Sequence, residues 1–365
     1  MRASLHRALL TYGGGLVLHT ASSGRIAGLD ALYLRLDDGE TVAVGEVRLN
    51  IAYLNGLDPE QVLAEAVDVV GALDFSPDAA ALLAEPPAAF RAASAPVRML
   101  IDGALHDRTA KRAGLPLARF LGATAETALA HATNQTLFVS DEVTFIARAE
   151  AYVARGFRDL KVRIGNGDIG EDLRRIALLR ARFGEAVKIA ADANGAWSEG
   201  AARGHLAALA AHDLAYVEQP IAPGDWAALD RLARVSPLPI MLDESVKGLD
   251  EVDRIAASGN GLMAHLKLVK LGGIAPTLAA ARHLRVAGVP FMIGQMNEGG
   301  LATAAALHVA LAAGPRFAEL YGADGLTNDP ARGLTYADGR VVAPALPGLG
   351  LTFDANATHL IKEFS

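Results

Sequence analysis

The chain of 365 residues contains no cysteine, which excludes a disulfide framework, a thiolate metal site and a cysteine nucleophile. It has no block of basic residues, and its formal net charge of −7 argues against nucleic acid or an anionic membrane as a partner. No apolar run approaches the roughly 18 residues of a membrane-spanning helix. The opening stretch has only a short apolar run before Tyr12 and three glycines, so we expect a cytoplasmic protein without a signal peptide.

Hydrophobic residues, by contrast, make up 52% of the chain, which predicts a large packed core. After residue 125, short apolar runs alternate with segments of helical periodicity. This alternation predicts βα units around a parallel sheet, and eight such units over about 200 residues predict a closed (β/α)8 barrel. The expected barrel strands lie near 129–137, 159–164, 187–192, 215–218, 239–243, 262–268, 289–294 and 316–321.

Different patterns flank the predicted barrel, which we place at 126–325. Residues 1–125 are interpreted as a smaller α+β domain, with a hairpin around the turn Asp37-Asp38-Gly39 and a helix that begins at Asp58-Pro59. Residues 326–365 are interpreted as extended chain that returns to this first domain.

Carboxylates end three consecutive predicted strands, at Asp192, Glu218 and Asp243. They are 26 and 25 residues apart, which is one βα unit each, so they are expected at the same height of the barrel mouth. Unpaired carboxylates in such a cluster would repel one another, and a divalent cation removes the conflict. All-oxygen ligands favour Mg²⁺, with Mn²⁺ as the alternative. Each carboxylate taken alone also fits an ordinary polar cap.

Cations are expected on both sides of this carboxylate cluster. Lys161 and Arg163 are two residues apart on the second predicted strand, so they point to the same face. Lys267 ends the sixth strand, which lies across the barrel from the second. The usual place of a lysine is the solvated surface, but these positions point into the barrel mouth.

Seven segments carry the pattern of a known family: GEV (45–47), IDGALHDRTAKRAGLPLARFLGA (101–123), DANGAW (192–197), VEQP (217–220), LDES (242–245), KLVKLGGI (267–274) and NEGGLATAAALHVA (297–310). On these segments, the chain resembles the enolase superfamily, and within it the mandelate racemase and muconate lactonizing enzyme branch. The resemblance covers nearly the whole chain. It implies a modified TIM (β/α)8 barrel under an α+β capping domain that both chain ends build.

The resemblance also implies a first chemical step. Mg²⁺ is expected on Asp192, Glu218 and Asp243, with the carboxylate of a small-molecule substrate bound to it. A base then removes the proton from the adjacent carbon, and the metal stabilises the resulting enediolate. Lys267 is interpreted as this base. Asn194 and Glu244 are expected just behind the metal ligands, where Glu244 would orient Lys267.

The chain departs from the family pattern at Arg163. The family usually has a second acid/base lysine there, whereas arginine stays protonated and is a poor base. We therefore interpret Lys161 and Arg163 as positive charge for the enediolate or for a second anionic group of the substrate. One-base chemistry, such as dehydration or cycloisomerisation, is the favoured interpretation. A racemase or epimerase that uses both Lys161 and Lys267 is the alternative.

Two further features narrow the reaction, and two alternative functions stay open. The seventh strand ends in Gln295 rather than the histidine of the mandelate racemase type, and the Asp-x-Asp signature of dipeptide epimerases is missing near Glu319 and Tyr321. A non-catalytic, enolase-like binding protein stays a further alternative because of Arg163. A barrel enzyme for phosphorylated sugars would need a glycine-rich phosphate loop, for which Gly299-Gly300 and Gly322 are a thin signal.

Substrate contacts are expected from the barrel mouth and from two loops of the first domain. Both loops, 12–25 and 48–53, also fit plain surface loops. The alanine-rich helices of the first domain suggest a homo-oligomer, and nothing in the sequence names the substrate. The candidate contacts are Gln295, Asn297, Glu298 and Glu319 in the barrel and Tyr12, Arg25 and Tyr53 in the loops.

Overall fold

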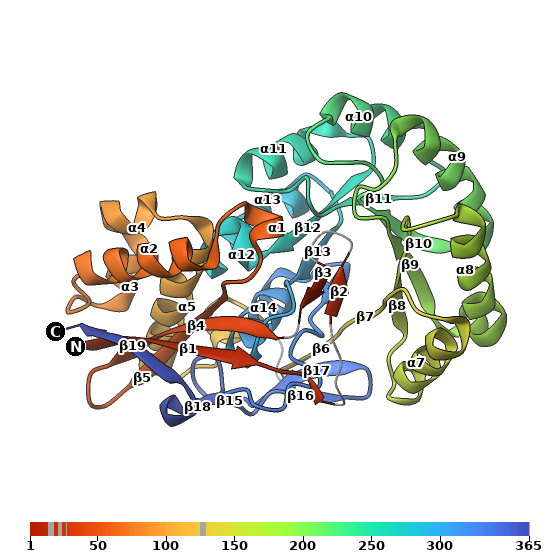
Figure 1. Ribbon diagram of the computed structural model, residues 1–365. Helices are drawn as coiled ribbons and strands as arrows, with labels where there is room; N and C mark the ends of the chain where they lie inside the picture. The colour runs from red at the N-terminus through yellow and green to blue at the C-terminus, as the bar shows by residue number, and fades with distance from the viewer. Residues whose placement is uncertain (14–17, 21–23, 27, 125–128, 365) are drawn as a thin grey trace.

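The computed structural model describes residues 1–13, 18–20, 24–26, 28–124 and 129–364. Its architecture is a mixed α/β one, in which a barrel-like sheet ringed by helices adjoins a smaller sheet that carries both termini (Figure 1). The fold class expected from the sequence is therefore confirmed. None of the helices in these described ranges is long and apolar enough to cross a membrane.

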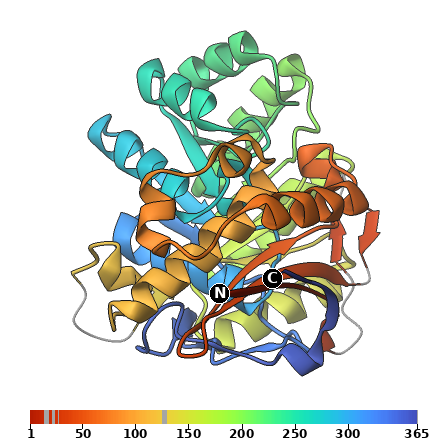
Figure 2. The same cartoon turned by 90° about the vertical axis from the view of Figure 1, so that its left-hand side faces the viewer.

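The smaller sheet has the order β19-β1-β4-β5 and joins the two ends of the chain. β1 pairs antiparallel with both β4 and β19, and Ala3 is in register with Phe364 of β19. The two termini therefore lie side by side (Figure 2). The turn between β4 and β5 is held by the Asp38 carboxylate, which accepts from the backbone N–H groups of Glu40 and Thr41. The bounds are β1 Arg2–Leu10, β4 Leu29–Asp37, β5 Val42–Arg48 and β19 His359–Phe364.

Helices of the first domain pack on one face of this sheet. Asp58 caps α2 in a capping box with Gln61, as the Asp58-Pro59 pattern predicts. α5 lies so close to β5 that a Cβ at Gly45 would be 2.0 Å from the Leu100 carbonyl oxygen, so only glycine fits at this crossing. The helices are α1 Ala52–Asn55, α2 Pro59–Ala72, α3 Ala79–Ala84, α4 Ala88–Ala92, α5 Ala95–Arg112 and α6 Leu117–Phe120.

Eight parallel strands form the larger sheet in chain order, from β7 to β14. One backbone hydrogen bond, from Asn134 N–H to Ala318 C=O at 3.0 Å, joins the two edges of this nearly closed barrel. β8 and β12 are four strands apart and so lie across it. The bounds are β7 Gln135–Leu137, β8 Asp159–Arg163, β9 Lys188–Asp192, β10 Leu214–Glu218, β11 Ile240–Leu242, β12 Leu262–Lys267, β13 Phe291–Gly294 and β14 Phe317–Glu319.

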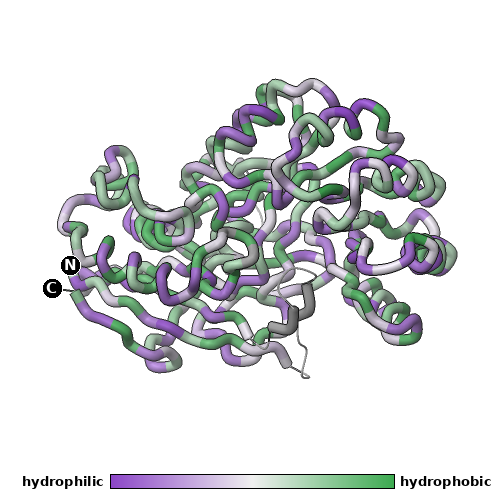
Figure 3. The backbone as a smooth tube through the Cα atoms, turned by 45° about the horizontal axis from the view of Figure 1, so that its top comes forward, coloured by the Kyte–Doolittle hydropathy of each residue, from purple (hydrophilic) through white to green (hydrophobic). Residues whose placement is uncertain are grey.

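Helices follow the barrel strands, and hydrophobic and hydrophilic residues alternate along each of them (Figure 3). In α10, for example, Ala228, Leu229 and Leu232 are the buried residues that face the sheet. The helices are α7 Glu142–Ala154, α8 Ile169–Phe183, α9 Glu199–Leu209, α10 Trp226–Val235, α11 Leu249–Ser258, α12 Leu268–Leu271, α13 Ile274–Val286 and α14 Gly300–Ala313.

The first predicted barrel strand, near 129–137, is in fact two strands. β6 (Leu129–Ala132) pairs antiparallel with β17 (Arg340–Ala343), and only β7 enters the barrel. The polar pair Thr133-Asn134 separates them, and its side chains bond to the end of β14. The domain boundaries drawn from the sequence stay a prediction. The short strands outside the two main sheets are β2 Leu18–Thr20, β3 Gly24–Ile26, β15 Ala331–Arg332, β16 Thr335–Ala337 and β18 Thr352–Phe353.

Two kinds of side chain fill the barrel interior. A small apolar cluster occupies one layer, and a layer of charged residues lies above it at the carboxyl ends of the strands. Because side chains alternate along a strand, residues two apart on each barrel strand contribute to successive inward layers. The apolar cluster consists of Ala190, Tyr216, Met241, Met263 and Met292.

Candidate active site

The three predicted carboxylates lie on neighbouring strands at the barrel mouth. Asp192 ends β9 and is paired in register with Glu218, which ends β10, while Asp243 directly follows β11. Their side chains are almost fully buried. The equal spacing of the βα units therefore produces the juxtaposition expected from the sequence.

Asp243 lies between two buried lysines. Lys267 Nζ is 2.7 Å from its Oδ2 atom, and Lys270 Nζ is 2.7 Å from its Oδ1 atom. Lys270 also donates to the carbonyl oxygens of Asp243 and His265, which saturates its three protons. Lys267 has one carboxylate partner and a contact of 3.2 Å with Met296 Sδ. Lys267 is thus the less constrained of the two amines.

Glu218 also has a partner at each carboxylate oxygen. Lys161 Nζ is 3.0 Å from Oε2, and the Nδ1 atom of His265 is 3.0 Å from Oε1. Lys161 also forms ion pairs with Glu319 and, at 3.5 Å, with Asp192. Burial opposes the charge of Lys161, but these three carboxylates outweigh it and raise its pKa. Burial likewise opposes the charge of Lys267, but Asp243 raises its pKa, so both amines are protonated in this arrangement.

Asp192 faces Arg163, its neighbour in register on β8. The Arg163 guanidinium also donates to Asn194 Oδ1 at 2.5 Å, and Asn194 Nδ2 donates to Glu244 Oε1 at 3.0 Å. Burial opposes the charge of Arg163, yet the Asp192 carboxylate raises its pKa. Glu244 was expected to orient Lys267, but its hydrogen bond comes from Asn194 instead. Burial and the nearby Asp243 raise the pKa of Glu244.

Carboxylates outnumber cations in this cluster, because the contacts above link five carboxylates to four cations. Burial raises the pKa of Asp192 to about 7 and also raises that of Glu244, so these two groups are costly to keep ionised without a further cation. Each oxygen of Glu218 and Asp243 accepts one donor from a side chain and retains a lone pair. The residues present therefore fit a hard divalent cation with oxygen ligands. The cations are Lys161, Arg163, Lys267 and Lys270, and the carboxylates are Asp192, Glu218, Asp243, Glu244 and Glu319.

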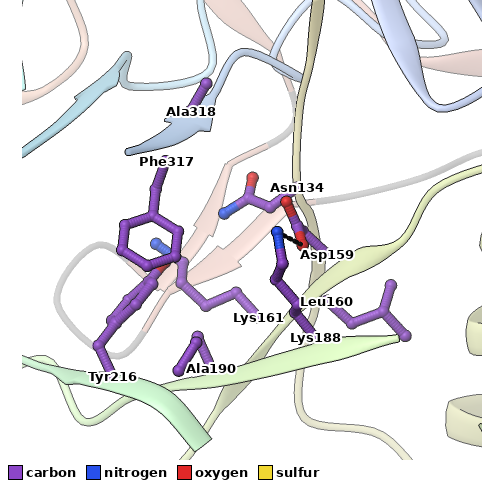
Figure 4. Close-up of a pocket in the computed structure, with 10 residues that line it drawn as sticks. Asn134, Asp159, Leu160, Lys161, Lys188, Ala190, Tyr216, Phe317 and Ala318 are labelled. Atoms are coloured by element: carbon purple, nitrogen blue, oxygen red, sulfur yellow. Dashed lines mark ion pairs between the residues drawn. The ribbon is translucent and has the colours of Figure 1, made fainter. Parts of the chain in front are cut away.

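A small cavity lies in the barrel interior near the N-terminal ends of the strands, and Lys161 is one of the residues that line it (Figure 4). Its volume is about 10 Å³, which is close to the space that one water molecule needs. Asn134 lines it and donates to Glu319 Oε2 at 3.0 Å, whereas its buried Oδ1 atom has no partner among the described residues. Glu319 is therefore held between Asn134 and Lys161, as a counter-ion of Lys161.

Other predicted substrate contacts belong to the loop after β13. Gln295 donates to Thr303 and accepts from the Glu298 N–H, so its amide shapes the loop. Glu298 is buried, its Oε1 atom has no partner in the described structure, and burial raises its pKa to about 7. Asn297 donates to the Tyr12 hydroxyl at 3.2 Å.

Among the substrate contacts predicted in the loops of the first domain, Tyr12 is a residue that the structure places against the barrel loops. Its hydroxyl donates to the Gly322 carbonyl oxygen after β14 at 2.5 Å, so it connects two barrel loops. Part of the predicted loop 12–25, including Ser22 and Ser23, lies outside the described residues. The side chains of Arg25 and Tyr53 also lie outside the described part of the chain.

The sequence argument missed His265. This residue lies two positions before Lys267 on β12, so its side chain also points into the barrel, and it is fully buried. Ligand atoms of Glu218, Asp243 and His265 lie within 4.8 Å of one another. The strand alternation that identified Lys161 with Arg163 was the signal that would have found it.

This barrel, with its buried carboxylates and lysines at the carboxyl ends of the strands, has the features of a TIM-barrel enzyme with a metal centre. Residues 144–357 match the family model described as enolase C-terminal domain-like, and the chain belongs to this family. The L-Ala-D/L-Glu epimerase of Bacillus subtilis is 33% identical over 257 residues, which cover 69% of each chain. Muconate cycloisomerase 1 of Pseudomonas putida is 31% identical over 261 residues, which cover 70% of this chain and 68% of that protein.

A solved structure is similar over almost the full length. The muconate lactonizing enzyme of Pseudomonas fluorescens, in complex with muconolactone, superposes with a TM-score of 0.88 at 26% identity. The match covers 97% of this chain and 96% of that one. The resemblance drawn from the sequence motifs is thus confirmed, and the protein is an enzyme of the enolase superfamily.

Proposed function

We propose that the protein is a Mg²⁺-dependent enzyme that removes the proton next to the carboxylate of a small-molecule substrate. Asp192, Glu218 and Asp243 would hold the metal. A bound Mg²⁺ supplies positive charge beside the substrate carboxylate, where negative charge develops as the proton leaves. The convergence of three buried carboxylates from neighbouring strands carries this proposal, because burial makes their charges costly and one divalent cation would stabilise all three.

Lys267 is the proposed base. Its carboxylate partner Asp243 is also a proposed metal ligand, so the cation would take up the charge that now stabilises the Lys267 ammonium. Lys161 would share two of its carboxylate partners, Asp192 and Glu218, with the metal, but it also pairs with Glu319, which is not a proposed ligand and would keep the ammonium group charged. Lys267, which lies across the barrel from Lys161, is therefore the better proton acceptor.

The opposite face of the site carries fixed positive charge. Arg163 is held by Asp192 and Asn194 and does not release a proton near neutral pH. Together with Lys161, it would stabilise charge that develops on the substrate, or bind a second anionic group. We therefore propose one-base chemistry, in which a group at the β-carbon leaves or adds while Lys267 takes or returns the α-proton. Cycloisomerisation and dehydration are both reactions of this type.

An epimerase or racemase is the second candidate, and the epimerase relative at 33% identity favours it. This reaction requires proton transfer on both faces, so Lys161 would have to act opposite Lys267. Its ion pair with Glu319, which is not a proposed metal ligand, argues against that role.

Proton exchange in D₂O tests the proposal and separates the two candidates. The protein with Mg²⁺ is incubated with single enantiomers of hydroxy acids, lactone carboxylates and dipeptides, and the α-proton is followed by ¹H NMR. One-base chemistry predicts exchange or elimination with one enantiomer and no inversion. Loss of the α-proton with formation of the other enantiomer would support the epimerase instead. No exchange with any of these substrates, although Mg²⁺ binds, would contradict the proposed substrate class.

A further inference from the structure

His265 lies directly behind the proposed metal ligands. It is on β12, fully buried, one inward layer below Lys267. Its Nδ1 atom is 3.0 Å from Glu218 Oε1 and 3.8 Å from Asp243 Oδ1. The contact with Glu218 is therefore a hydrogen bond, and the contact with Asp243 is longer than one.

The surroundings determine which ring nitrogen carries the proton. An ionised carboxylate only accepts hydrogen bonds, so Nδ1 must be the donor to Glu218. Nε2 has no hydrogen-bond partner among the described residues, and a buried N–H group without an acceptor is costly, so the surroundings support a proton on Nδ1 and none on Nε2.

The hydrogen bond from His265 completes the support of Glu218. Lys161 donates to Oε2 and His265 donates to Oε1, so one donor on each side sets the plane of the carboxylate. The remaining lone pairs of Glu218 are thereby directed before any cation binds. Donors of this kind behind a ligand typically change metal affinity by 10- to 100-fold.

Gly294 provides the space for the imidazole ring. A Cβ at this position would be 2.0 Å from His265 Nε2 and 3.0 Å from both ring carbons next to it. Gly294 ends β13 in strand geometry, and its φ is not among the positive values, so backbone conformation does not require a glycine there. Any larger residue would collide with the Nε2 edge of the ring and displace the ring from its position beside Glu218.

We propose that His265 is a positioning residue that holds Glu218 in its ligand orientation, and that Gly294 is the residue that admits its ring. This inference rests on the proposed metal site. It concerns how the site is pre-organised and goes beyond which residues bind the ion. His265 touches neither substrate nor cation in this arrangement and acts through Glu218 alone.

Three variants test the inference through metal binding. His265→Asn retains an N–H donor at the position of Nδ1, His265→Leu retains bulk without a donor, and Gly294→Ala displaces the ring. Mg²⁺ affinity is measured by calorimetry, and Mn²⁺ affinity by electron paramagnetic resonance of the free ion. We expect His265→Leu and Gly294→Ala to bind both ions about 10- to 100-fold more weakly. His265→Asn should remain close to the wild type.

A double variant separates donor from bulk. Asn lacks the Nε2 edge of the ring, so His265→Asn combined with Gly294→Ala should bind metal more tightly than Gly294→Ala alone. Circular dichroism and thermal unfolding identify any variant that fails to fold. If His265→Leu does not fold, the metal affinities of the two Asn variants still show whether the hydrogen-bond donor matters.

The outcomes distinguish this inference from the metal site itself. If His265→Leu is merely less stable and binds metal like the wild type, the positioning role is overturned and the metal site stands. Equal weakening by Asn and Leu would also overturn it, because bulk and not the donor would matter. A wild-type protein that binds neither ion would overturn both the metal site and the role of His265.

Discussion

The Nζ atom of Lys267 lies 2.7 Å from Oδ2 of Asp243, which joins the proposed base to a proposed metal ligand. Replacing Lys267 by alanine should therefore remove the proton acceptor while the ligand carboxylates remain. We expect α-proton exchange in D₂O to fall by about 10²- to 10⁴-fold, as is typical for the loss of a general base. Mg²⁺ binding, measured by calorimetry, should persist.

The matched control for this change is Lys247→Ala. Lys247 is an exposed lysine on the loop after β11, outside the charged cluster. The Lys247→Ala variant should show the same rate of α-proton exchange as the wild type. Exchange that survives Lys267→Ala would show that another group, with Lys161 as the next candidate, takes the proton.

Removing one proposed metal ligand should abolish metal binding. Asp192→Ala leaves two carboxylates and frees the Arg163 guanidinium, which then adds positive charge to the site. We expect no calorimetric heat of Mg²⁺ binding and no stabilisation by Mg²⁺ in thermal unfolding. Asp250→Ala, an exposed aspartate on α11, serves as the control. Undiminished Mg²⁺ affinity in Asp192→Ala would remove this residue from the ligand set.

A lysine in place of Arg163 should change the stereochemistry of the reaction. An amine at this position, on β8 across the barrel from Lys267, is able to lose a proton, whereas the guanidinium is not. We expect Arg163→Lys to exchange slowly the α-proton of the enantiomer that the wild type leaves untouched. Chiral chromatography of the reaction mixture measures this change. Arg163→Gln, which offers no base, should not acquire it. If the wild type itself interconverts both enantiomers, the one-base proposal is wrong.

The sequence was sufficient to predict the main features of the fold and of the site, because both depend on periodicity. Equal βα spacing places residues at the ends of successive strands at one height, which is why Asp192, Glu218 and Asp243 lie together. The alternation of side chains along β8 likewise placed Lys161 in the barrel. The family confirmed by the comparisons is the one that these strand ends resemble.

Contacts between side chains from distant segments were not predictable in the same way. Glu244 accepts a hydrogen bond from Asn194, and Asn194 has a φ of 45°, a local backbone conformation that no periodic pattern reveals. β6 leaves the barrel because a distant segment, β17, offers it hydrogen bonds. His265 was overlooked because a single histidine within a strand carries no motif of its own.

Glu46 should prove important for the attachment of the first domain to the barrel. Its buried carboxylate, at the end of β5, accepts from the backbone N–H groups of Gly299, Leu301 and Ala302 at the start of α14. α14 begins without a side-chain cap of its own, so Glu46 serves in its place. Because three buried donors lose their partner, Glu46→Ala should destabilise the protein by about 3–5 kcal/mol.

Urea denaturation measures this change in the free energy of unfolding. Glu46→Gln retains one acceptor oxygen and should fall between the wild type and Glu46→Ala. Glu85→Ala, at an exposed position after α3, should lie within about 0.5 kcal/mol of the wild type. A loss below about 1 kcal/mol in Glu46→Ala would mean that water replaces the carboxylate at this helix end.

His308 should make the stability of the protein depend on pH. This buried residue of α14 accepts from the Ala118 N–H at Nδ1 (2.9 Å) and donates from Nε2 to the Leu349 carbonyl oxygen (3.2 Å). It thus connects the barrel to α6 and to the C-terminal segment. Burial lowers the pKa of His308 to about 4, from 6.5 in an unfolded chain.

The direction of the effect follows from proton binding. Between pH 6.5 and 4, the unfolded chain protonates this histidine and the folded protein does not, so its contribution to stability is complete above pH 6.5 and declines toward pH 4. The decline corresponds to about 3 kcal/mol. In urea denaturation, the difference in unfolding free energy between the wild type and His308→Gln should shrink by this amount from pH 7 to pH 4, because other groups titrate equally in both. A difference that stays constant over this range would mean that His308 takes up its proton at the same pH in the folded and the unfolded protein, and its hydrogen bond from Ala118 would then have to be absent.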